Sequence, residues 1–258
     1  MASKLMIDTT NNRPRPFVIL SHERSGTNYL VSRLLLSTEV VVGQEPFNPE
    51  FLGYETHPDC VVPSGIFDKM NDRTFRDTDK SAYIEFCSGI TGALDNTGIA
   101  ASGFKIMYHY DTYWQMTLDR RFYAIVLERK SVLSVYSSML IANQTTEWVA
   151  HNSTQTEKQV QVEFVPELYK TFKKEYRHNF HQTEKNLASV GATVLKIYYE
   201  DLITDPECFV SVINFLGISN SFTGESWMLK QNDSNVLNRF TNPQDAMPFF
   251  EAEGWEFD

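Results

Sequence analysis

Apolar residues gather in short runs that are separated by longer segments with helical spacing. The first run is Phe17-Val18-Ile19-Leu20, which has the length and composition of a strand buried on both faces. Similar runs occur at residues 40–42, 103–107, 122–127 and 192–198. Helical periodicity is found at residues 27–37, in pieces from about 67 to 93, and at 111–119, 130–142, 163–188 and 206–216. Strands that alternate with helices predict an α/β fold with a central, mostly parallel sheet flanked by helices.

The chain is expected to consist of a short polar tail and one domain. Residues 1–16 are polar, and Pro14 and Pro16 favour extended backbone in the residues before them. No internal repeat, low-complexity tract or second boundary follows, so residues 17–258 are expected to form a single domain. Residues 143–162 are polar and without periodicity, which predicts a loop or lid.

The net charge limits the classes of partner. Lysine and arginine number 23 against 33 aspartates and glutamates, a formal charge of −10, which argues against a general nucleic-acid binder. Any phosphate site is therefore expected to be local. No run approaches the roughly 20 apolar residues of a membrane span, and the first residues lack the apolar core of a signal peptide. Cys60, Cys87 and Cys208 have neither metal-ligand nor disulfide spacing, so we expect free thiols in a cytoplasmic protein.

One strand-to-helix junction has the composition of an anion-binding loop. It reads FVILSHERSGTNYL, residues 17–30, and lacks the Gly-x-x-x-x-Gly-Lys-Ser/Thr pattern of nucleotide hydrolases. Gly26 lets the backbone approach an anion, and a helix that opens at Thr27 or Asn28 aims its amides and its positive end at it. Arg24 adds a two-donor side chain, and the hydroxyls of Ser25 and Thr27 add more donors. The alternative is a capped strand-to-helix turn, in which such residues are ordinary.

A second segment has the features of another phosphate site. In LERKSVLSVYSSML, residues 127–140, Arg129 follows a strand, and Ser134, Ser137 and Ser138 fall on one helical stripe. An arginine at the carboxyl end of a strand and hydroxyls on the next helix can bind a phosphate at the open edge of a sheet. The alternative is a surface helix whose serines face water.

Together these segments resemble the sulfotransferases that use 3′-phosphoadenosine 5′-phosphosulfate (PAPS). The likeness is to the bacterial carbohydrate and small-molecule branch, which includes nodulation-factor and trehalose sulfotransferases. It continues with GFKIM at 103–107, VLKIYYEDLITDP at 194–206, FLGI at 215–218 and WMLKQN at 227–232. It spans residues 17 to about 245, and it implies a P-loop-like three-layer fold in one sulfotransferase domain.

The resemblance also implies the cofactor and its contacts. The loop at residues 24–28 would bind the 5′-phosphosulfate, and Arg129 with Ser137, eight residues later, the 3′-phosphate of PAPS and of its product, adenosine 3′,5′-bisphosphate (PAP). Cytosolic members usually carry lysine at the position of Arg24. Arginine keeps the positive charge of that lysine, but it is a weaker proton donor to the leaving group. Arg239 would lie in a C-terminal segment that closes over the nucleotide. No metal is expected.

The reaction implied is in-line transfer of the sulfuryl group to an acceptor hydroxyl. Arg24, the loop amides and Lys105 would stabilise charge on the moving group, and a general base would take the acceptor proton. Glu45 is the first candidate, although trehalose-type members place their base where this chain has Asn48. His109 is the second, and the loop residues 22 and 23, a histidine and a glutamate, are alternatives.

The acceptor is expected to be a small molecule or sugar, as in natural-product biosynthesis. Its nucleophile is expected to be a hydroxyl or, alternatively, an amine or carbamoyl nitrogen. Nucleic acid is not expected as a partner, and homo-oligomerisation stays open.

Glu200 and Asp201 are interpreted as a pair that caps a helix and orders a loop. Two other functions compete: a small-molecule kinase that uses ATP, which would need a Lys-Ser/Thr pair in the loop, and a non-catalytic nucleotide-binding module of the same fold.

Overall fold

The structure analysed is a computed structural model of the 258-residue chain. It describes residues 14–48, 53–95, 97–148, 160–219, 222 and 235–253, except for the side chains of 89–93. Most of the predicted tail, part of the predicted lid, and the segment WMLKQN lie outside the described residues.

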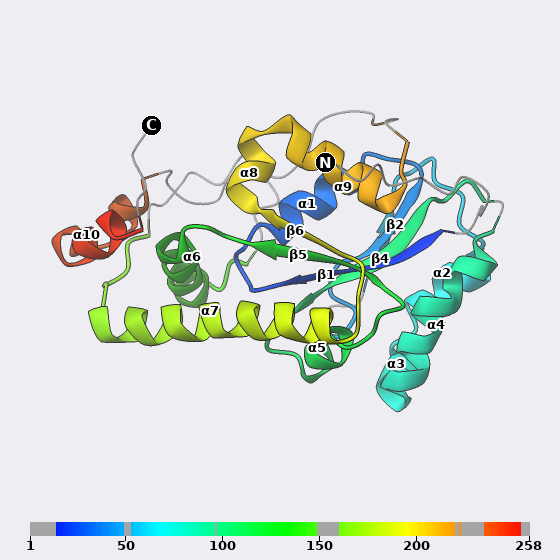
Figure 1. Cartoon of the computed structure of the whole chain (residues 1–258), viewed down its shortest axis with the longest axis horizontal. Helices are drawn as coiled ribbons and strands as arrows, with labels where there is room; N and C mark the ends of the chain where they lie inside the picture. Colours follow the sequence, from blue (N-terminus) through cyan, green and yellow to red (C-terminus); the bar gives the residue numbers. More distant parts are fainter. Residues whose placement is uncertain are drawn as a thin grey trace.

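A six-stranded sheet forms the centre of the protein (Figure 1). Its strands are β1 (Arg15–Ser21), β2 (Val40–Gly43), β3 (Tyr54–Thr56), β4 (Ala101–Met107), β5 (Tyr123–Glu128) and β6 (Val194–Tyr198). They lie in the order β3-β2-β4-β1-β5-β6, and all pairs are parallel except β2 with β3. After β1 the chain forms β2, β3 and β4 on one side of that strand, and it then crosses to the other side to form β5 and β6. The loops after β1 and β5 therefore flank a switch point at the carboxyl edge, where α/β proteins bind ligands.

Helices cover both faces of this sheet, as predicted. They are α1 (Thr27–Leu34), α2 (Ser64–Met70), α3 (Arg73–Thr78), α4 (Lys80–Ala93), α5 (Asp111–Met116), α6 (Val132–Thr145), α7 (Pro166–Ser189), α8 (Tyr199–Thr204), α9 (Pro206–Leu216), the 3₁₀ helix η1 (Val236–Arg239) and α10 (Pro243–Glu251). In Figure 1, α5, α6 and α7 lie on one side of the strands, and α1, α8 and α9 lie on the other. The α/β fold with a mostly parallel sheet is thus confirmed.

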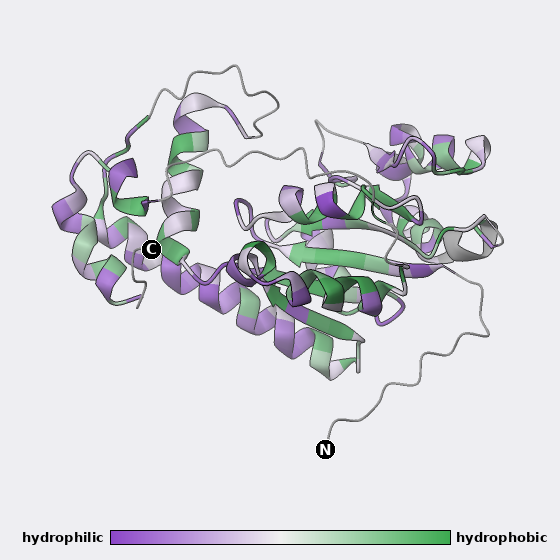
Figure 2. Ribbon diagram, turned by 90° about the horizontal axis from the view of Figure 1, so that it is seen from above, coloured by the Kyte–Doolittle hydropathy of each residue, from purple (hydrophilic) through white to green (hydrophobic). Residues whose placement is uncertain are grey.

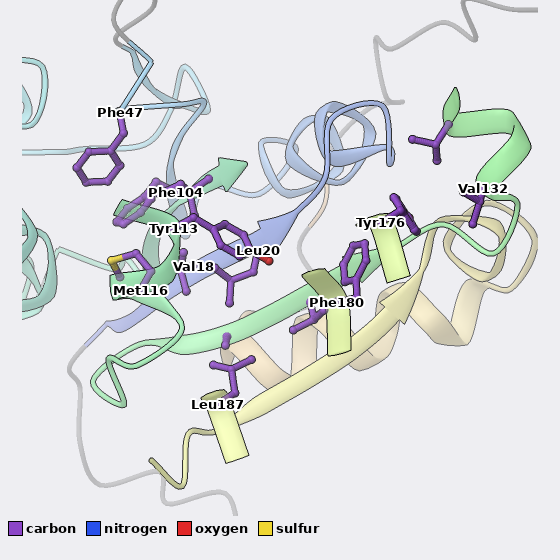
Figure 3. Packing of buried hydrophobic residues seen from close by; sticks show 14 of the residues in the cluster. Val18, Leu20, Phe47, Phe104, Tyr113, Met116, Val132, Tyr176, Phe180 and Leu187 are labelled. Atoms are coloured by element: carbon purple, nitrogen blue, oxygen red, sulfur yellow. The ribbon is translucent and has the colours of Figure 1, made fainter. Parts of the chain in front are cut away.

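Alternation along β1 creates two hydrophobic cores. Val18 and Leu20 face the layer that contains α7, whereas Phe17 and Ile19 face the layer that contains α1 and α9. Figure 3 shows Val18 and Leu20 with residues of α7, among them Tyr176, Phe180 and Leu187. In Figure 2 the central strands are hydrophobic, and α7 carries hydrophilic residues along its length. A strand with both faces buried explains why its sequence is a continuous apolar run.

The close contact of β4 with β1 gives the first prediction. A methyl group on Gly103 would lie 2.1 Å from the carbonyl oxygen of Phe17, its partner in β1. Since backbone cannot give way in the middle of a sheet, Gly103→Ala is expected to lower the free energy of unfolding by about 3 kcal/mol. Urea denaturation measures this. Gly65→Ala in α2 is the control, because its methyl group would meet nothing within 4 Å; equal effects of the two changes would contradict the packing described.

Candidate functional site

The loop after β1 places an uncompensated helix end at the carboxyl edge of the sheet. Gly26 caps α1 in the left-handed conformation, with φ 89° and ψ 16°. Among its described residues, α1 has no side-chain cap and no acidic residue in its first turn. The first amides and the positive end of the helix dipole are therefore directed at the loop, where they favour an anion.

Ser25 supplies an independent sign of a ligand. Its hydroxyl is fully buried and makes no hydrogen bond of ordinary length and angle within the described residues. Tyr176 of α7 is close to it, and the phenol is also engaged by the backbone of Arg129, from whose N–H it accepts at 2.9 Å. A buried polar group without a partner is costly unless a ligand or water satisfies it. The Ser25 hydroxyl and the α1 amides together fit a bound phosphate or sulfate oxygen.

Arg24 connects the loop to α6. Its backbone is left-handed, with φ 62°, which is uncommon for a residue other than glycine. The guanidinium donates to the hydroxyl of Ser138 at 2.8 Å and to the carbonyl of Trp148, while the Arg24 carbonyl accepts from Arg129 Nη1 at 3.2 Å. Burial, and then the nearby Arg129, lower the pKa of Arg24 to about 10. Two guanidinium groups thus lie near each other at the open edge of an acidic protein.

Two further arginines, Arg129 and Arg239, lie near this loop. Arg129 directly follows β5, and Glu200 holds its Nε at 3.4 Å. Arg239 comes from η1 and is buried; it donates to the hydroxyl of Ser137 at 3.1 Å and to the Ser134 carbonyl at 3.3 Å. The structure therefore brings Arg239 next to Ser137, although 102 residues separate them.

A third group of residues lies on the other side of the loop. Lys105 of β4 is buried, forms an ion pair with Glu45 at 3.2 Å, and donates to the side-chain oxygen of Asn28. Glu45 also accepts from the Tyr110 hydroxyl and from Asn48, both at 3.2 Å. Burial lowers the pKa of Lys105, and Glu45 offsets part of that effect. Asn28 thus faces Lys105, so it connects the loop helix to β4.

His109 pairs with the loop residue Glu23. Nδ1 of His109 is bonded to one carboxylate oxygen of Glu23, and Nδ1 of His22 lies 3.1 Å from the other. The bond with Glu23 raises the pKa of His109, although burial opposes it. Burial alone would raise the pKa of Glu23, but both histidines outweigh it and the net shift is downward. His22 is buried and stacks on Tyr108 with ring centroids 4.2 Å apart, and burial lowers its pKa.

Two residues that shape the site, Tyr176 and Tyr199, were not predicted from the sequence. Tyr176 contacts the backbone of Arg129, and Tyr199 packs against Gly26 and Arg129. Glu200 bonds the backbone after β5. Glu200 therefore orders a loop, as interpreted, whereas α8 is capped by Tyr198 without a side-chain hydrogen bond. The available signal was positional: Tyr199 and Glu200 follow β6 directly, at the edge where Arg129 follows its neighbour β5.

Within the described residues no group of three or more His, Cys, Asp or Glu side chains could hold a metal ion. No helix in that part of the chain has both the length and the apolar composition needed to cross a membrane.

Comparisons with known proteins give remote structural likenesses. No family model and no curated protein sequence matches the chain. The chain is similar to a sulfotransferase from Alicyclobacillus acidocaldarius, with 15% identity and a TM-score of 0.49 over 93% of this chain and 92% of that one. It is also similar to the sulfotransferase domain of the Synechococcus PCC 7002 olefin synthase (15% identity, TM-score 0.42, 96% and 98% of the two chains). A third similar structure is retinol dehydratase in a complex with retinol and PAP, with 13% identity and a TM-score of 0.36 over 95% of this chain and 83% of that one. Likenesses with TM-scores this low carry no function to this chain.

Proposed function

We propose that this protein is a PAPS-dependent sulfotransferase that acts on a small-molecule or sugar acceptor. The observation that carries the proposal is that two groups of residues suited to an anion meet at one edge of the sheet. The loop with Arg24 and Gly26 forms one half, and Arg129 with Ser137 and Arg239 forms the other. A concentration of arginines beside a helix N-terminus is unexpected in a chain of charge −10 unless it binds an anion.

The two halves suit a donor that carries one phosphate at each end of its ribose. The amides of α1 and the Ser25 hydroxyl would hold the 5′-phosphosulfate, with Arg24 beside them. Arg129 and the Ser137–Arg239 pair would hold the 3′-phosphate. PAPS supplies an activated sulfuryl group, and Lys105, buried and bonded to the first turn of α1, would stabilise charge on that group as it moves.

His109 is the favoured general base for the acceptor. The carboxylate of Glu45 is already engaged by Lys105, Tyr110 and Asn48, whereas the His109 ring is partly exposed. When neutral His109 donates from Nδ1 to Glu23, its lone pair is on Nε2, where it can accept a proton. We therefore assign proton transfer to His109, and we assign to Glu45 the positioning of Lys105.

Release of PAP tests the proposed function directly. The protein is incubated with sulfur-labelled PAPS and a panel that contains glucose, glucosamine, trehalose, 4-nitrophenol and an aminoalcohol. We expect label to move to at least one acceptor, with one PAP formed per transfer. Hydroxyl and amine members of the panel separate O-transfer from N-transfer. Failure of PAPS and PAP to bind the protein would overturn the proposal, whichever acceptors are tried.

Thermal unfolding separates this function from the kinase alternative. The loop has no Lys-Ser/Thr pair, so ATP with magnesium lacks its usual contacts here. A ligand at 100 times its Kd stabilises the folded state by about 2.7 kcal/mol. Saturating PAP is therefore expected to raise Tm by several degrees, and ATP with magnesium to leave it nearly unchanged. A larger shift with ATP that disappears on adding a chelator would favour the kinase.

A further inference from the structure

The ring of Tyr199 contacts both the backbone of Gly26 and the guanidinium of Arg129. A methyl group placed on Gly26 would lie 2.1 Å from Cδ2 of Tyr199, so the ring lies directly against the loop backbone. The guanidinium of Arg129 lies over the same ring, with its carbon 4.6 Å from the centroid. One aromatic ring thus contacts both halves of the site.

Glu200, the next residue, fixes the backbone that carries Arg129. Its carboxylate accepts from the N–H of Lys130 at 2.9 Å and of Ser131 at 3.5 Å, in addition to its contact with Arg129 Nε. Both Arg129 and Glu200 are mostly buried, with side chains 14% and 16% exposed. A buried carboxylate with several donors holds its partners in one geometry. Rotation of the Arg129 side chain away from the ring would also break its contact with Glu200.

We propose that Tyr199 and Glu200 are positioning residues that hold the loop at Gly26 and the side chain of Arg129 at a fixed separation. The site then selects nucleotides that carry phosphate at both the 5′ and 3′ positions over those that carry one. This inference rests on the proposed function and adds a specificity device to it. Tyr199 and Glu200 lie on α8, which follows β6, whereas the Gly26 loop follows β1 and Arg129 follows β5.

A purely structural role makes a different prediction from a positioning role. If Tyr199 only filled space, its loss would lower the free energy of unfolding, and nucleotide affinities would fall no further than in a control variant that loses a similar ring far from the site. If it positions both halves, its loss weakens probes for each half separately. Arg129, by contrast, belongs to one half, and its loss is expected to weaken only probes that carry a 3′-phosphate.

The experiment measures binding of three probes by calorimetry: 5′-AMP, 3′-AMP and PAP. We expect Tyr199→Ala to weaken both 5′-AMP and 3′-AMP about tenfold, and Tyr199→Phe, which keeps the ring, to bind within about twofold of the wild type. Glu200→Gln is expected to weaken 3′-AMP and PAP and to spare 5′-AMP. If Tyr199→Ala does not fold, Tyr199→Leu removes the aromatic face with less loss of volume.

Tyr123→Ala is the matched control. Tyr123 lies at the opposite end of β5, where Arg15 rests over its ring at 5.3 Å, so the change removes a similar cation–π contact far from the site. Affinities that fall no further for Tyr199→Ala than for Tyr123→Ala, or that fall for one monophosphate only, would overturn the inference.

A second measurement needs no nucleotide. Gly26→Ala should destabilise the wild type more than it destabilises Tyr199→Ala, because the clash with the ring is gone while the left-handed backbone remains. Equal costs in the two backgrounds would also overturn the inference. If the costs differ but PAP does not bind the wild type, the proposed function fails, the selectivity for doubly phosphorylated nucleotides fails with it, and only the packing contact is upheld.

Discussion

Arg129→Ala is expected to weaken PAP binding about 100-fold, or about 2.7 kcal/mol. The guanidinium is mostly buried, is supported by Glu200 and the Tyr199 ring, and donates to the carbonyl of Arg24. Its removal would delete the proposed charge-assisted contact with the 3′-phosphate and leave the Glu200 carboxylate without its arginine. Arg129→Lys keeps the charge but loses the planar two-donor group, so an intermediate loss of affinity is expected.

Arg121→Ala is the control for this change. Arg121 lies before β5 begins, at the opposite end of the strand from Arg129, and its exposed side chain pairs with Asp119 and Glu85. The variant removes the same charge from the same protein, so a general electrostatic effect would weaken PAP equally in both. Calorimetry measures the two dissociation constants, and thermal unfolding confirms that each variant is folded. An unchanged Kd for Arg129→Ala would remove the 3′ half of the site from the proposal.

The sheet could be predicted because its strands are buried on both faces. Such strands are continuous apolar runs, and each predicted run overlaps a strand of the structure within about two residues. β3 was missed because it is a three-residue edge strand, Tyr54–Thr56, too short for a pattern. α8 was missed because it begins at Tyr199, directly after β6, with no turn residue between them. α10 was also not predicted; it contains Pro248, and proline is unfavourable inside a helix.

The site could be predicted only where chemistry is local in sequence. The loop at residues 24–28 and the Arg129–Ser137 spacing each occupy one short segment, so their composition carries a signal. Contacts such as Glu23 with His109, or Tyr199 with Gly26, join distant segments and depend on the order of strands in the sheet. Arg239 lies between these cases, because the family resemblance named it and η1 places it beside Ser137. The contact of its guanidinium with the Ser137 hydroxyl could not be predicted from composition alone.

His109→Ala is expected to lower the turnover number by between about 100- and 10,000-fold while leaving the Kd for PAP within about twofold. The loss falls on turnover because His109 would act on the acceptor proton and has no part in binding either phosphate. The proposed step would form a bond between the acceptor oxygen and sulfur and break the bond between sulfur and the 5′-phosphate oxygen. The acceptor proton would pass to His109 Nε2 and then to solvent. His178→Ala, which removes an exposed histidine from α7, controls for loss of a histidine as such.

The pH dependence distinguishes His109 from Glu45 as the base. A base must be unprotonated, and Glu23 raises the pKa of His109, so turnover should rise with pH through that raised value. Glu23→Gln removes the raising charge, so the pKa of His109 should fall and the rising limb should move to lower pH. The groups that surround this pair, His22, Glu45, Tyr108 and Glu175, remain in place in that variant. Glu45→Gln should reduce the rate through Lys105 and move the limb less than Glu23→Gln does, because Glu45 raises the pKa of His109 less than Glu23 does. A limb that is lost with Glu45→Gln and does not move with Glu23→Gln would make Glu45 the base.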